Sequence, residues 1–269
     1  MKKVLTIAGS DSSGGAGIQA DLKTILAHGM YGMSAITALT AQNTTGVYGV
    51  LESTPEFLKQ QLDCVFQDIF PDSVKIGMVS SGPLAAAIAD SLEEYQPGNI
   101  VLDTVMISTS GHKLLKEDAV AVLTKRLMPL AAIITPNIPE AEALLGRQID
   151  GYEAMKQAAV DLRERFGCAV LLKGGHLRDT ADDVLACAEG LVEYPGERVE
   201  SGNNHGTGCT LSSAIACNLA GGHTMAESVR RAKEYVTGAL KAGLDLGAGC
   251  GPVDHGYGMI MRIGGNRQR

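Results

Sequence analysis

Three small residues and one thiol stand together in the run His205-Gly-Thr-Gly-Cys209, which leads into an apolar segment with the pattern of a helix. The first turn of a helix carries unpaired N–H groups and the positive end of the helix dipole, and glycines let an anion approach the backbone. The run therefore predicts an anion hole with Cys209 as a reactive group beside it. The alternative is that the glycines only turn the chain and that Cys209 is a small buried apolar residue.

A second glycine-rich stretch, residues 9–17, follows a predicted strand and opens a predicted helix, as a phosphate-binding loop does. It is not a Walker loop, because Gly14 is followed by Gly-Ala rather than by Lys and a hydroxyl residue. A dinucleotide site is disfavoured too, since the next acidic residue after Asp21 is Glu52. The remaining interpretation is a loop that closes over a small ligand, with Asp21 one turn inside the helix. The alternative is an ordinary tight turn between strand and helix.

Carboxylates follow two other predicted strands. Asp103 ends one of them, and the segment 135–140 sets Asn137 and Glu140 three residues apart after the next. Mg²⁺ prefers oxygen ligands and keeps part of its hydration shell, so Asp103 and Glu140 are suited to hold it through water. The alternative is that Asn137 caps a helix and that Glu140 interacts favourably with its dipole.

Three further side chains that follow predicted strands are suited to bind a ligand. Lys173 precedes two glycines and can act as a point charge for a phosphate. Gln42 offers a donor and an acceptor to the edge of a heterocycle, and Met78 can lie against the face of the ring. Each has a simpler alternative, because a lysine at a strand end is more often solvated and a methionine more often packs in the core.

Short runs rich in β-branched residues alternate with longer helical patterns, which is typical of a mostly parallel central sheet with helices on both faces. The predicted strands are 4–8, 34–40, 74–76, 100–103, 132–135 and 169–173, with a hairpin at 183–187 and 191–194. The predicted helices are 17–28, 55–67, 83–94, 117–126, 152–166, 209–219 and 225–242. Ligands of such sheets bind beyond the carboxyl ends of the strands. We expect one α/β domain over residues 1–263 and a frayed tail at 264–269.

The composition narrows the classes of partner. The 269-residue chain has a net charge of −7 and no basic block, so nucleic acid is not an expected partner. Its six cysteines show no recurring spacing, which argues against a disulfide framework or a structural zinc site. The N-terminal apolar run is too short for a signal peptide, and no apolar segment long enough to span a membrane follows. We therefore expect a cytoplasmic protein without a membrane partner.

Taken in order along the chain, these motifs resemble those of the ribokinase-like superfamily, and within it the hydroxymethylpyrimidine/phosphomethylpyrimidine kinases of thiamine biosynthesis. The matching segments are 5–24, 41–43, 75–78, 102–106, 134–141, 172–176 and 205–213. The resemblance implies a ribokinase-like fold, a homodimer, and ATP and Mg²⁺ at the site. It further implies transfer of the γ-phosphoryl group of ATP to the hydroxymethyl group of an aminopyrimidine alcohol. The monophosphate would then be phosphorylated to the diphosphate used for thiamine.

The resemblance also implies roles for single residues. Those that would contact the pyrimidine are Gln42 and Asp21, at its amino group and ring nitrogens, and Met78 and Val105, at the face of the ring. Those that would handle phosphate and metal are Gly206, Thr207 and Gly208 in the anion hole, Lys173, Asn137 and Thr207 at ATP, and Asp103, Asn137 and Glu140 around Mg²⁺. Cys209 would accept the proton of the alcohol. The helix start lowers the pKa of such a thiol and nearby phosphates raise it, so the sequence leaves its protonation state open.

Two segments depart from the family pattern. The run Ser108-Thr-Ser-Gly-His112 lacks the usual lysine and acid of a predicted lid, which weakens the expectation that the lid captures phosphate. Asn203-Asn204 replaces Asn-Thr before the anion hole, a milder change.

Three other functions remain as alternatives. They are a pyridoxal or pyridoxine kinase of the same fold, a pyrimidine-binding protein without turnover, and a cysteine hydrolase that pairs His205 with Cys209. Gln42 favours the pyrimidine over pyridoxal, because an amide offers both a donor and an acceptor to an aminopyrimidine edge.

Overall fold

The computed structural model describes residues 1–105, 117–175, 182–196, 199 and 202–259. Its strands are β1 (Lys3–Asp11), β2 (Tyr31–Asn43), β3 (Gly46–Glu52), β4 (Ser73–Ile76), β5 (Ile100–Leu102), β6 (Ile133–Ile134), β7 (Ala169–Leu172), β8 (Asp183–Cys187) and β9 (Gly190–Tyr194). Its helices are α1 (Gly17–Ala27), α2 (Pro55–Asp68), α3 (Gly82–Tyr95), α4 (Glu117–Val122), the π-helical turn η1 (Leu123–Leu127), α5 (Met128–Leu130), α6 (Ile138–Leu145), α7 (Tyr152–Phe166), α8 (Thr207–Ala220) and α9 (Met225–Lys241).

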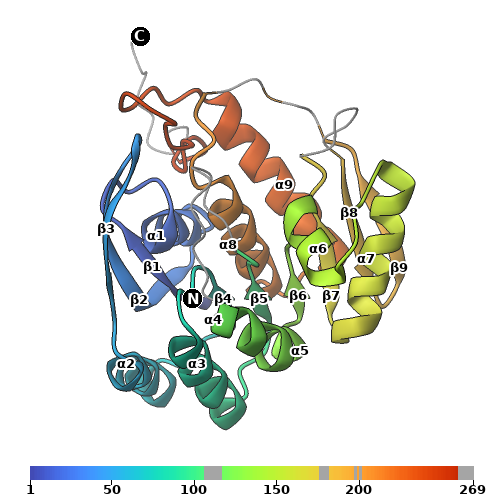
Figure 1. Cartoon of the computed structure of the whole chain (residues 1–269). Helices are drawn as coiled ribbons and strands as arrows, with labels where there is room; N and C mark the ends of the chain where they lie inside the picture. The colour runs from blue at the N-terminus through green and yellow to red at the C-terminus, as the bar shows by residue number, and fades with distance from the viewer. Residues whose placement is uncertain (106–116, 176–181, 197–198, 200–201, 260–269) are drawn as a thin grey trace.

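The strands form one sheet in the order β3-β2-β1-β4-β5-β6-β7-β8-β9 (Figure 1). The six central strands, β2 through β7 in that order, pair in parallel. At one edge β3 pairs with β2 in antiparallel fashion, and at the other edge the β8–β9 hairpin continues the sheet from β7, also antiparallel. The prediction of a mostly parallel sheet is confirmed. All six central strands therefore present their carboxyl ends along one edge of the molecule.

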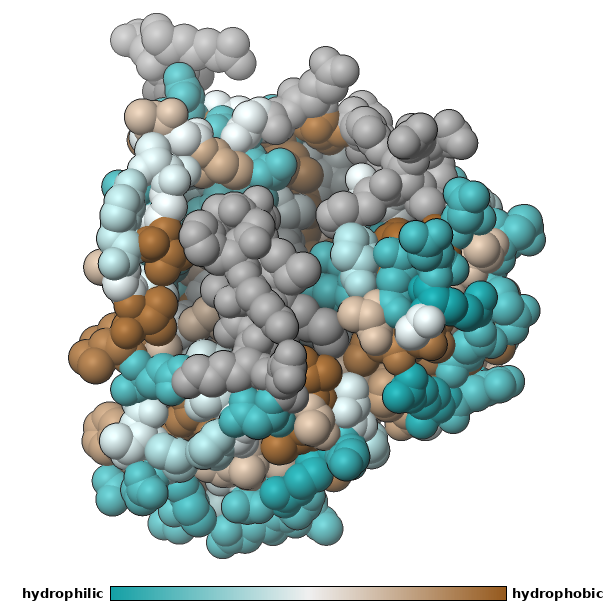
Figure 2. All heavy atoms as spheres, in the orientation of Figure 1, coloured by the Kyte–Doolittle hydropathy of each residue, from teal (hydrophilic) through white to brown (hydrophobic). Residues whose placement is uncertain are grey.

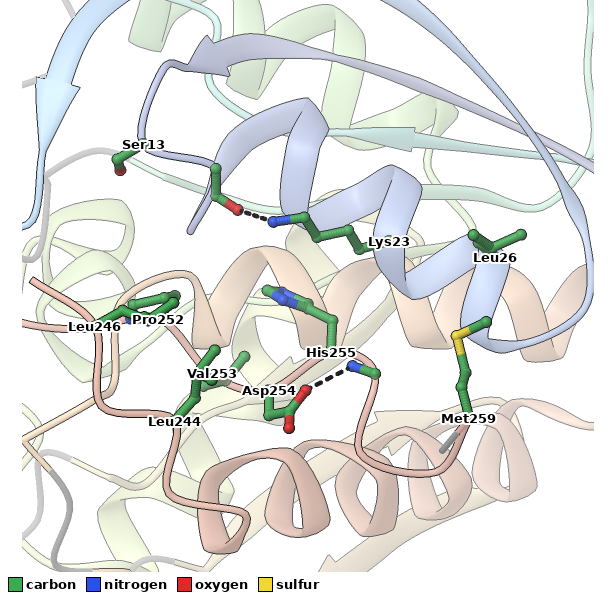
Figure 3. A pocket seen from close by; sticks show the side chains of 12 residues that line it. Ser13, Lys23, Leu26, Leu244, Leu246, Pro252, Val253, Asp254, His255 and Met259 are labelled. Atoms are coloured by element: carbon green, nitrogen blue, oxygen red, sulfur yellow. Dashed lines mark hydrogen bonds between the residues drawn. The ribbon is translucent and has the colours of Figure 1, made fainter. Parts of the chain in front are cut away.

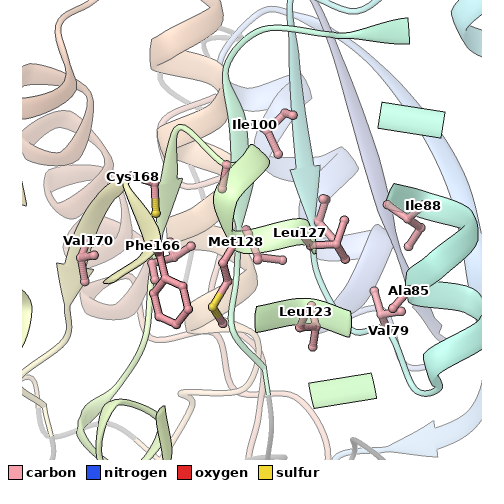
Figure 4. Packing of buried hydrophobic residues seen from close by; sticks show 14 of the residues in the cluster. Val79, Ala85, Ile88, Ile100, Leu123, Leu127, Met128, Phe166, Cys168 and Val170 are labelled. Carbon is pink, nitrogen blue, oxygen red and sulfur yellow. The ribbon is translucent and has the colours of Figure 1, made fainter. Parts of the chain in front are cut away.

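Helices cover both faces of the sheet, as predicted, because the strand residues alternate between two cores. Leu5, Ile7 and Leu102 point into a larger core that helices α2 through α7 complete, part of which is shown in Figure 4. Val4 and Val101 point to the opposite side, where α1, α8 and α9 pack. The hydrophobic side chains of both cores are mostly aliphatic, and the structure also buries charged residues, among them Asp21, Lys75 and Asp103.

Helix starts differ in how their free N–H groups are satisfied. The side chain of Thr54 accepts a hydrogen bond at the start of α2, and that of Thr224 does so at the start of α9. In contrast, α1 begins after Ala16 and α8 begins after Gly206 without a side-chain cap among the described residues. Uncapped N–H groups of a first turn are available to an anionic ligand.

The structure adds two elements that the sequence pattern did not indicate clearly. Strand β3 was not predicted, because it contains two glycines and most of its residues are exposed on the sheet edge. The helical pattern predicted to end at residue 126 continues through η1 and α5 to Leu130. No helix within the described ranges is both long enough and apolar enough to cross a membrane. The segment Ser108 to His112 and the tail 264–269 lie outside the described residues.

Candidate active site

A row of chemically useful side chains follows the carboxyl ends of the six parallel strands. In the spatial order of the strands, it runs Gln42 (β2), Asp11 (β1), Met78 (after β4), Asp103 (after β5), Asn137 (after β6) and Lys173 (after β7). Adjacent strands lie about 4.8 Å apart, so neighbouring members of this row are close enough to contact one ligand. The strand order therefore places these residues along one edge of the sheet.

The start of α8 faces the middle of this row. Gly206 has φ 80°, which favours glycine, and a Cβ there would overlap the carbonyl oxygen of Gly15 in the glycine loop. A Cβ at Gly208 would instead lie 3.5 Å from Asp103 Oδ2 and 3.9 Å from Lys173 Nζ. The predicted anion hole and two predicted phosphate and metal residues therefore meet in space. The hydroxyl of Thr207 donates to the carbonyl of Asn204 at 2.7 Å, which holds the first turn in place.

Asp103 is almost fully buried and is held on both sides. Its Oδ1 accepts from Thr135 at 3.1 Å and lies 3.5 Å from Lys173 Nζ, while Oδ2 accepts from Ser212 of α8 at 3.2 Å. Burial opposes the charge of Lys173, but Asp103, Glu140 and Asp183 outweigh it and raise the pKa of this lysine. Lys173 is thus a cation fixed beside the start of α8.

Asn137 and Glu140 form a capping box at the start of α6. Asn137 Oδ1 accepts from the backbone N–H of Glu140 at 2.9 Å, and Glu140 Oε2 accepts from that of Asn137 at 2.9 Å. Thr104 donates to the same carboxylate oxygen at 2.9 Å. Burial raises the pKa of Glu140, although Lys173 lowers it. Asn137 therefore caps the helix, as the alternative interpretation of the sequence expected. In this position the carboxylate of Glu140 still interacts electrostatically with Lys173 and Asp103.

The donor set is compatible with Mg²⁺ but not with a metal held by protein ligands alone. Among the described residues no group of three or more His, Cys, Asp or Glu side chains is placed to hold a metal ion. Asp103 and Glu140 are two buried carboxylates near a cation and an uncapped helix start. Mg²⁺ is commonly held by one or two carboxylates together with water and substrate phosphates, which fits this arrangement.

Cys209 lies in the first turn of α8 and is partly exposed. Burial raises the pKa of its thiol to about 11, Lys75 lowers it, and Asp21 and Asp103 raise it. The backbone of Gly17, at the start of α1, also contacts the thiol and lowers its pKa. Cys209 therefore sits between two helix starts, and its thiol carries its proton at neutral pH.

The structure places Asp21 differently from the direct pyrimidine contact that the resemblance implied. Its side chain has no exposed surface, and Lys75 Nζ lies 2.9 Å from both of its oxygens. Thr6 donates to Oδ2 at 2.6 Å and Ser213 donates to Oδ1 at 2.8 Å. Asp21 thus anchors a buried network below Cys209. Sequence reasoning missed Lys75, although it lies in one of the matching segments, because a lysine within a strand usually reaches solvent.

A second network, centred on His205, was also missed. His205 Nε2 lies 3.0 Å from Asp11 Oδ2 and 3.1 Å from Gln42 Nε2. Asp11 also accepts from the backbone of Ser13, Gly15 and Ala16 at 2.8–3.0 Å, so it organises the glycine loop. Burial opposes its ionisation, but these bonds and that from His205 outweigh it and lower the pKa of Asp11. In the described residues His205 Nε2 faces Asp11 and Gln42 rather than Cys209, which disfavours a hydrolase pair.

Met78 and Val105 lie where a ring could pack. Met78 is partly exposed, and a Cβ at Gly9 of β1 would come within 2.6 Å of its Cε, so its side chain lies over the end of β1. Val105 is partly exposed and is the last described residue before 106–116. Both follow neighbouring strands, β4 and β5, on either side of the row's centre.

The sequence of the chain matches the family model for phosphomethylpyrimidine kinase over residues 11–254. The chain belongs to the phosphomethylpyrimidine kinase family. It is 50% identical over 255 residues to the hydroxymethylpyrimidine/phosphomethylpyrimidine kinase of Rhizobium meliloti, covering 93% of this chain and 96% of that protein. It is 48% identical to the enzyme of the same name from Escherichia coli, covering 95% and 98%. It also matches a bifunctional thiamine biosynthesis protein of Geobacter sulfurreducens at 50% identity, but spans only 52% of that protein's length.

The chain is structurally similar to solved structures of two groups of kinases. The phosphomethylpyrimidine kinase of Clostridium difficile superposes with a TM-score of 0.81 at 49% identity, covering 88% of this chain and 98% of that chain. The ADP complex of Bacillus subtilis pyridoxal kinase superposes with a TM-score of 0.89 at 34% identity, covering 97% and 99%. The ribokinase-like fold is thus confirmed. The backbone is shared with pyridoxal kinases, and the sequence is closer to the pyrimidine kinases.

A pocket of about 300 Å³ adjoins the glycine loop of this family member, between α1 and the chain after α9 (Figure 3). Lys23 donates to the carbonyl of Gly14 at 2.7 Å, and His255 Nε2 lies 3.0 Å from Thr210 Oγ1. Burial lowers the pKa of His255 to about 4, and Lys23 adds to this effect. The lining includes Ser13 and Gly14 of the glycine loop. It includes no member of the row, so the pocket lies beside the candidate active site.

Proposed function

We propose that this chain transfers the γ-phosphoryl group of ATP to the hydroxymethyl group of hydroxymethylpyrimidine, and then phosphorylates the resulting monophosphate. The observation that carries the proposal is the meeting of Asp103 and Lys173 with Gly208 at the uncapped start of α8. A cation, a carboxylate and free N–H groups at one point match what phosphoryl transfer requires, because its catalysis is mostly positioning and charge stabilisation.

The two ends of the row would bind different substrates. Gln42, near the end of β2, and Met78, after β4, lie on the side of the glycine loop, and with Val105 they would contact the pyrimidine. Lys173 and Asn137 follow β7 and β6, on the other side, and they would contact the nucleotide. The reacting groups would meet between them, in front of the first turn of α8. Asp21, which is fully buried, would act beneath this site rather than on the ring.

The first turn of α8 would hold the transferring phosphoryl group. The backbone N–H of Gly208 lies in the first turn of a helix without a side-chain cap, and Lys173 adds a positive charge beside it, whereas the N–H of Thr207 donates to the carbonyl of Asn204 at 3.3 Å. Mg²⁺, held through water by Asp103 and Glu140, would supply charge neutralisation between the phosphates. Asp103 needs no large movement for this role, because Thr135 and Ser212 already fix its carboxylate.

Cys209 would accept the proton of the substrate hydroxyl. Its thiol is partly exposed beside Gly17, between the pyrimidine and phosphate ends of the row. In a loose transition state the hydroxyl proton leaves late, so a weak or scarce base still serves. Because burial raises the pKa of the thiol to about 11, the thiolate fraction is small near neutral pH and turnover should increase with pH.

An ADP-release assay over hydroxymethylpyrimidine, its monophosphate and pyridoxal tests the proposal. We expect the pyrimidine alcohol to be turned over faster than pyridoxal, and Cys209→Ala to lose about 10²-fold or more of that turnover while it still binds ATP. Cys64→Ala, which removes an exposed cysteine on α2, is the matched control and should behave as wild type. Faster pyridoxal turnover would favour the pyridoxal kinases, whose backbone this chain shares. Tight pyrimidine binding with no turnover would indicate a binding protein instead.

The same proposal includes a second copy of the chain as partner, in the cytoplasm. Edge strand β3 and the neighbouring β2 and α2 expose Leu39, Val50, Leu51 and Phe57 at 50–69%. Hydrophobic residues are visible on the left side of the molecule, where Figure 1 shows these elements (Figure 2). An exposed apolar edge strand is usually covered by another chain. We expect sedimentation to detect a dimer and Leu51→Lys to weaken it. Leu191→Lys on the opposite edge strand, β9, is the control, and equal sedimentation of all three proteins as monomers would refute this part.

A further inference from the structure

A fully buried ion pair lies within the core that supports the first turns of α1 and α8. Neither Lys75 nor Asp21 has exposed side-chain surface, and Lys75 Nζ lies 2.9 Å from each carboxylate oxygen of Asp21. Removing two charges from water carries a large desolvation cost, and apolar replacements of such pairs are often as stable or more stable. The position of this pair therefore calls for a reason other than stability.

The ammonium of Lys75 keeps its charge in this environment. Burial opposes the charge of Lys75, but Asp21, Cys209 and Asp103 outweigh it and raise the pKa of the ammonium. Asp21 accepts further hydrogen bonds from the hydroxyls of Thr6 and Ser213, at 2.6 Å and 2.8 Å. The pair is thus a salt bridge whose carboxylate is also satisfied from two neighbouring elements.

The pair lies one helical turn below the thiol of Cys209. On α8, Cys209 and Ser213 are four residues apart and share a face, and on α1 the same holds for Gly17 and Asp21. The backbone of Gly17 contacts the thiol, and Ser213 donates to Asp21. Helices α1 and α8 therefore contact each other at their first turns and again one turn further along. Lys75, on β4 of the sheet, contacts Asp21 at this second turn.

The ammonium group occupies space that a side chain at position 77 would need. Gly77 follows Lys75 in the chain, and a Cβ there would come within 2.6 Å of Lys75 Nζ. A side chain at position 77 would therefore displace the charge, and glycine leaves just enough room for it. The sequence Lys75-Ile-Gly-Met78 thus holds both the cation and, at its end, a residue of the candidate active site.

We propose that Lys75 is a positioning residue that acts through Cys209: its buried ammonium, fixed by Asp21, favours the thiolate over the thiol. This inference deepens the proposed function and rests on it for its catalytic meaning. In a poorly solvated interior the interaction of two nearby charges is only weakly screened. A permanent cation below the thiol therefore offsets part of the burial that keeps the thiol protonated.

The charged groups around the thiol give the direction of the effect. Lys75 lowers the pKa of the Cys209 thiol more strongly than Asp21 or Asp103 raises it, and the backbone of Gly17 lowers it further. Lys75→Met, which keeps the length of the side chain without its charge, should raise that pKa most. The double variant Lys75→Met/Asp21→Asn removes an opposing charge as well, so it should raise the pKa less.

Alkylation of Cys209 by iodoacetamide in the free protein measures this effect without turnover. Each unit of pKa increase lowers the thiolate fraction about 10-fold and raises its nucleophilicity about 3-fold, so the rate near pH 8 falls about 3-fold. We expect alkylation to be fastest in the wild type, slower in the double variant and slowest in Lys75→Met. The rate of Lys75→Met should be at least about 3-fold below that of the wild type. Peptide mass spectrometry separates Cys209 from the exposed Cys64 on α2, whose rate should not change. Lys125→Met, which removes an exposed lysine on η1, is the control.

The outcomes separate the possible roles of the pair. A purely structural role would loosen the packing around the helix starts when lost, and alkylation would become faster. Unchanged or faster alkylation in both variants would therefore overturn the inference. If Lys75→Met does not fold, the double variant carries the test, because it leaves no unpaired buried charge. Full turnover in Cys209→Ala would instead refute the base role in the proposed function, while the alkylation order would still decide what Lys75 does to the thiol.

Discussion

Gly208→Ala should separate catalysis from folding. Gly208 is the second residue of α8, and a Cβ there meets only Asp103 Oδ2 at 3.5 Å and Lys173 Nζ at 3.9 Å, which is ordinary van der Waals contact. Alanine also has a better helix propensity than glycine, by up to about 1 kcal/mol in a helix interior. The variant should therefore fold with unchanged or slightly higher stability.

The same methyl group occupies the space in front of Asp103 and Lys173 where the transferring phosphoryl group is proposed to lie. Displacement of that group from the backbone N–H groups of α8 removes an anion-hole contact, which typically costs about 10²- to 10³-fold in kcat. We expect a decrease of at least about 10²-fold with hydroxymethylpyrimidine and ATP. The ADP-release assay gives kcat, and thermal unfolding gives stability.

Gly98→Ala is the matched control for this experiment. Gly98 lies between α3 and β5, where a Cβ meets no atom of the described residues within 4 Å. It should show wild-type kcat and a wild-type melting temperature. If Gly208→Ala has near-normal kcat and a normal melting temperature, the first turn of α8 does not contact the phosphoryl group and the placement of the reaction is wrong.

Three other predictions follow from described contacts. Gly206→Ala should lower the melting temperature and abolish turnover, unlike Gly98→Ala, because its Cβ overlaps the backbone of Gly15; equal melting of the two would contradict the close packing. The kcat/KM for the pyrimidine should rise up to about 10-fold per pH unit from pH 7 towards pH 10, because burial raises the pKa of Cys209 to about 11 and the thiolate is the active form; a flat profile in a stable protein would count against the base role. Ser80→Ala should raise the free energy of unfolding by about 1 kcal/mol in urea denaturation, since its buried Oγ has no partner among the described residues; a clear loss of stability would show that this hydroxyl is bonded.

The sequence predicted the parts of the site that depend on the ends of single elements. Asp103 and Lys173 each end a parallel strand, and parallel strands end at one edge, so their approach follows from alternation of strands and helices alone. The helix start at Thr207 was equally predictable, because Gly206 and Gly208 stand at the beginning of an apolar helical pattern; its role as an anion hole stays a prediction. For Asn137, the sequence left a cap and a ligand role open, and the structure contains the cap.

The parts that the sequence did not predict depend on pairing between distant residues. Lys75 and Asp21 are 54 residues apart, and neither residue type is expected in a core, so nothing in the pattern links them. Strand β3 was not predicted for a different reason. Its glycines and exposed side chains remove the usual alternation of buried and exposed residues along a strand. The direct pyrimidine contact expected of Asp21 depended on the same missing information, since burial is set by Lys75, Thr6 and Ser213 together.

The bond between Asp11 and His205 joins residues 194 positions apart, and a β-bridge ties His205 to Pro252. During synthesis on a ribosome, the glycine loop emerges almost two hundred residues before its partner at position 205, and Pro252 emerges later still. A nascent or prematurely terminated polypeptide therefore has the strands that carry most of the row and no assembled centre. A polypeptide that stops before residue 205 thus lacks the contact that joins the glycine loop to the start of α8.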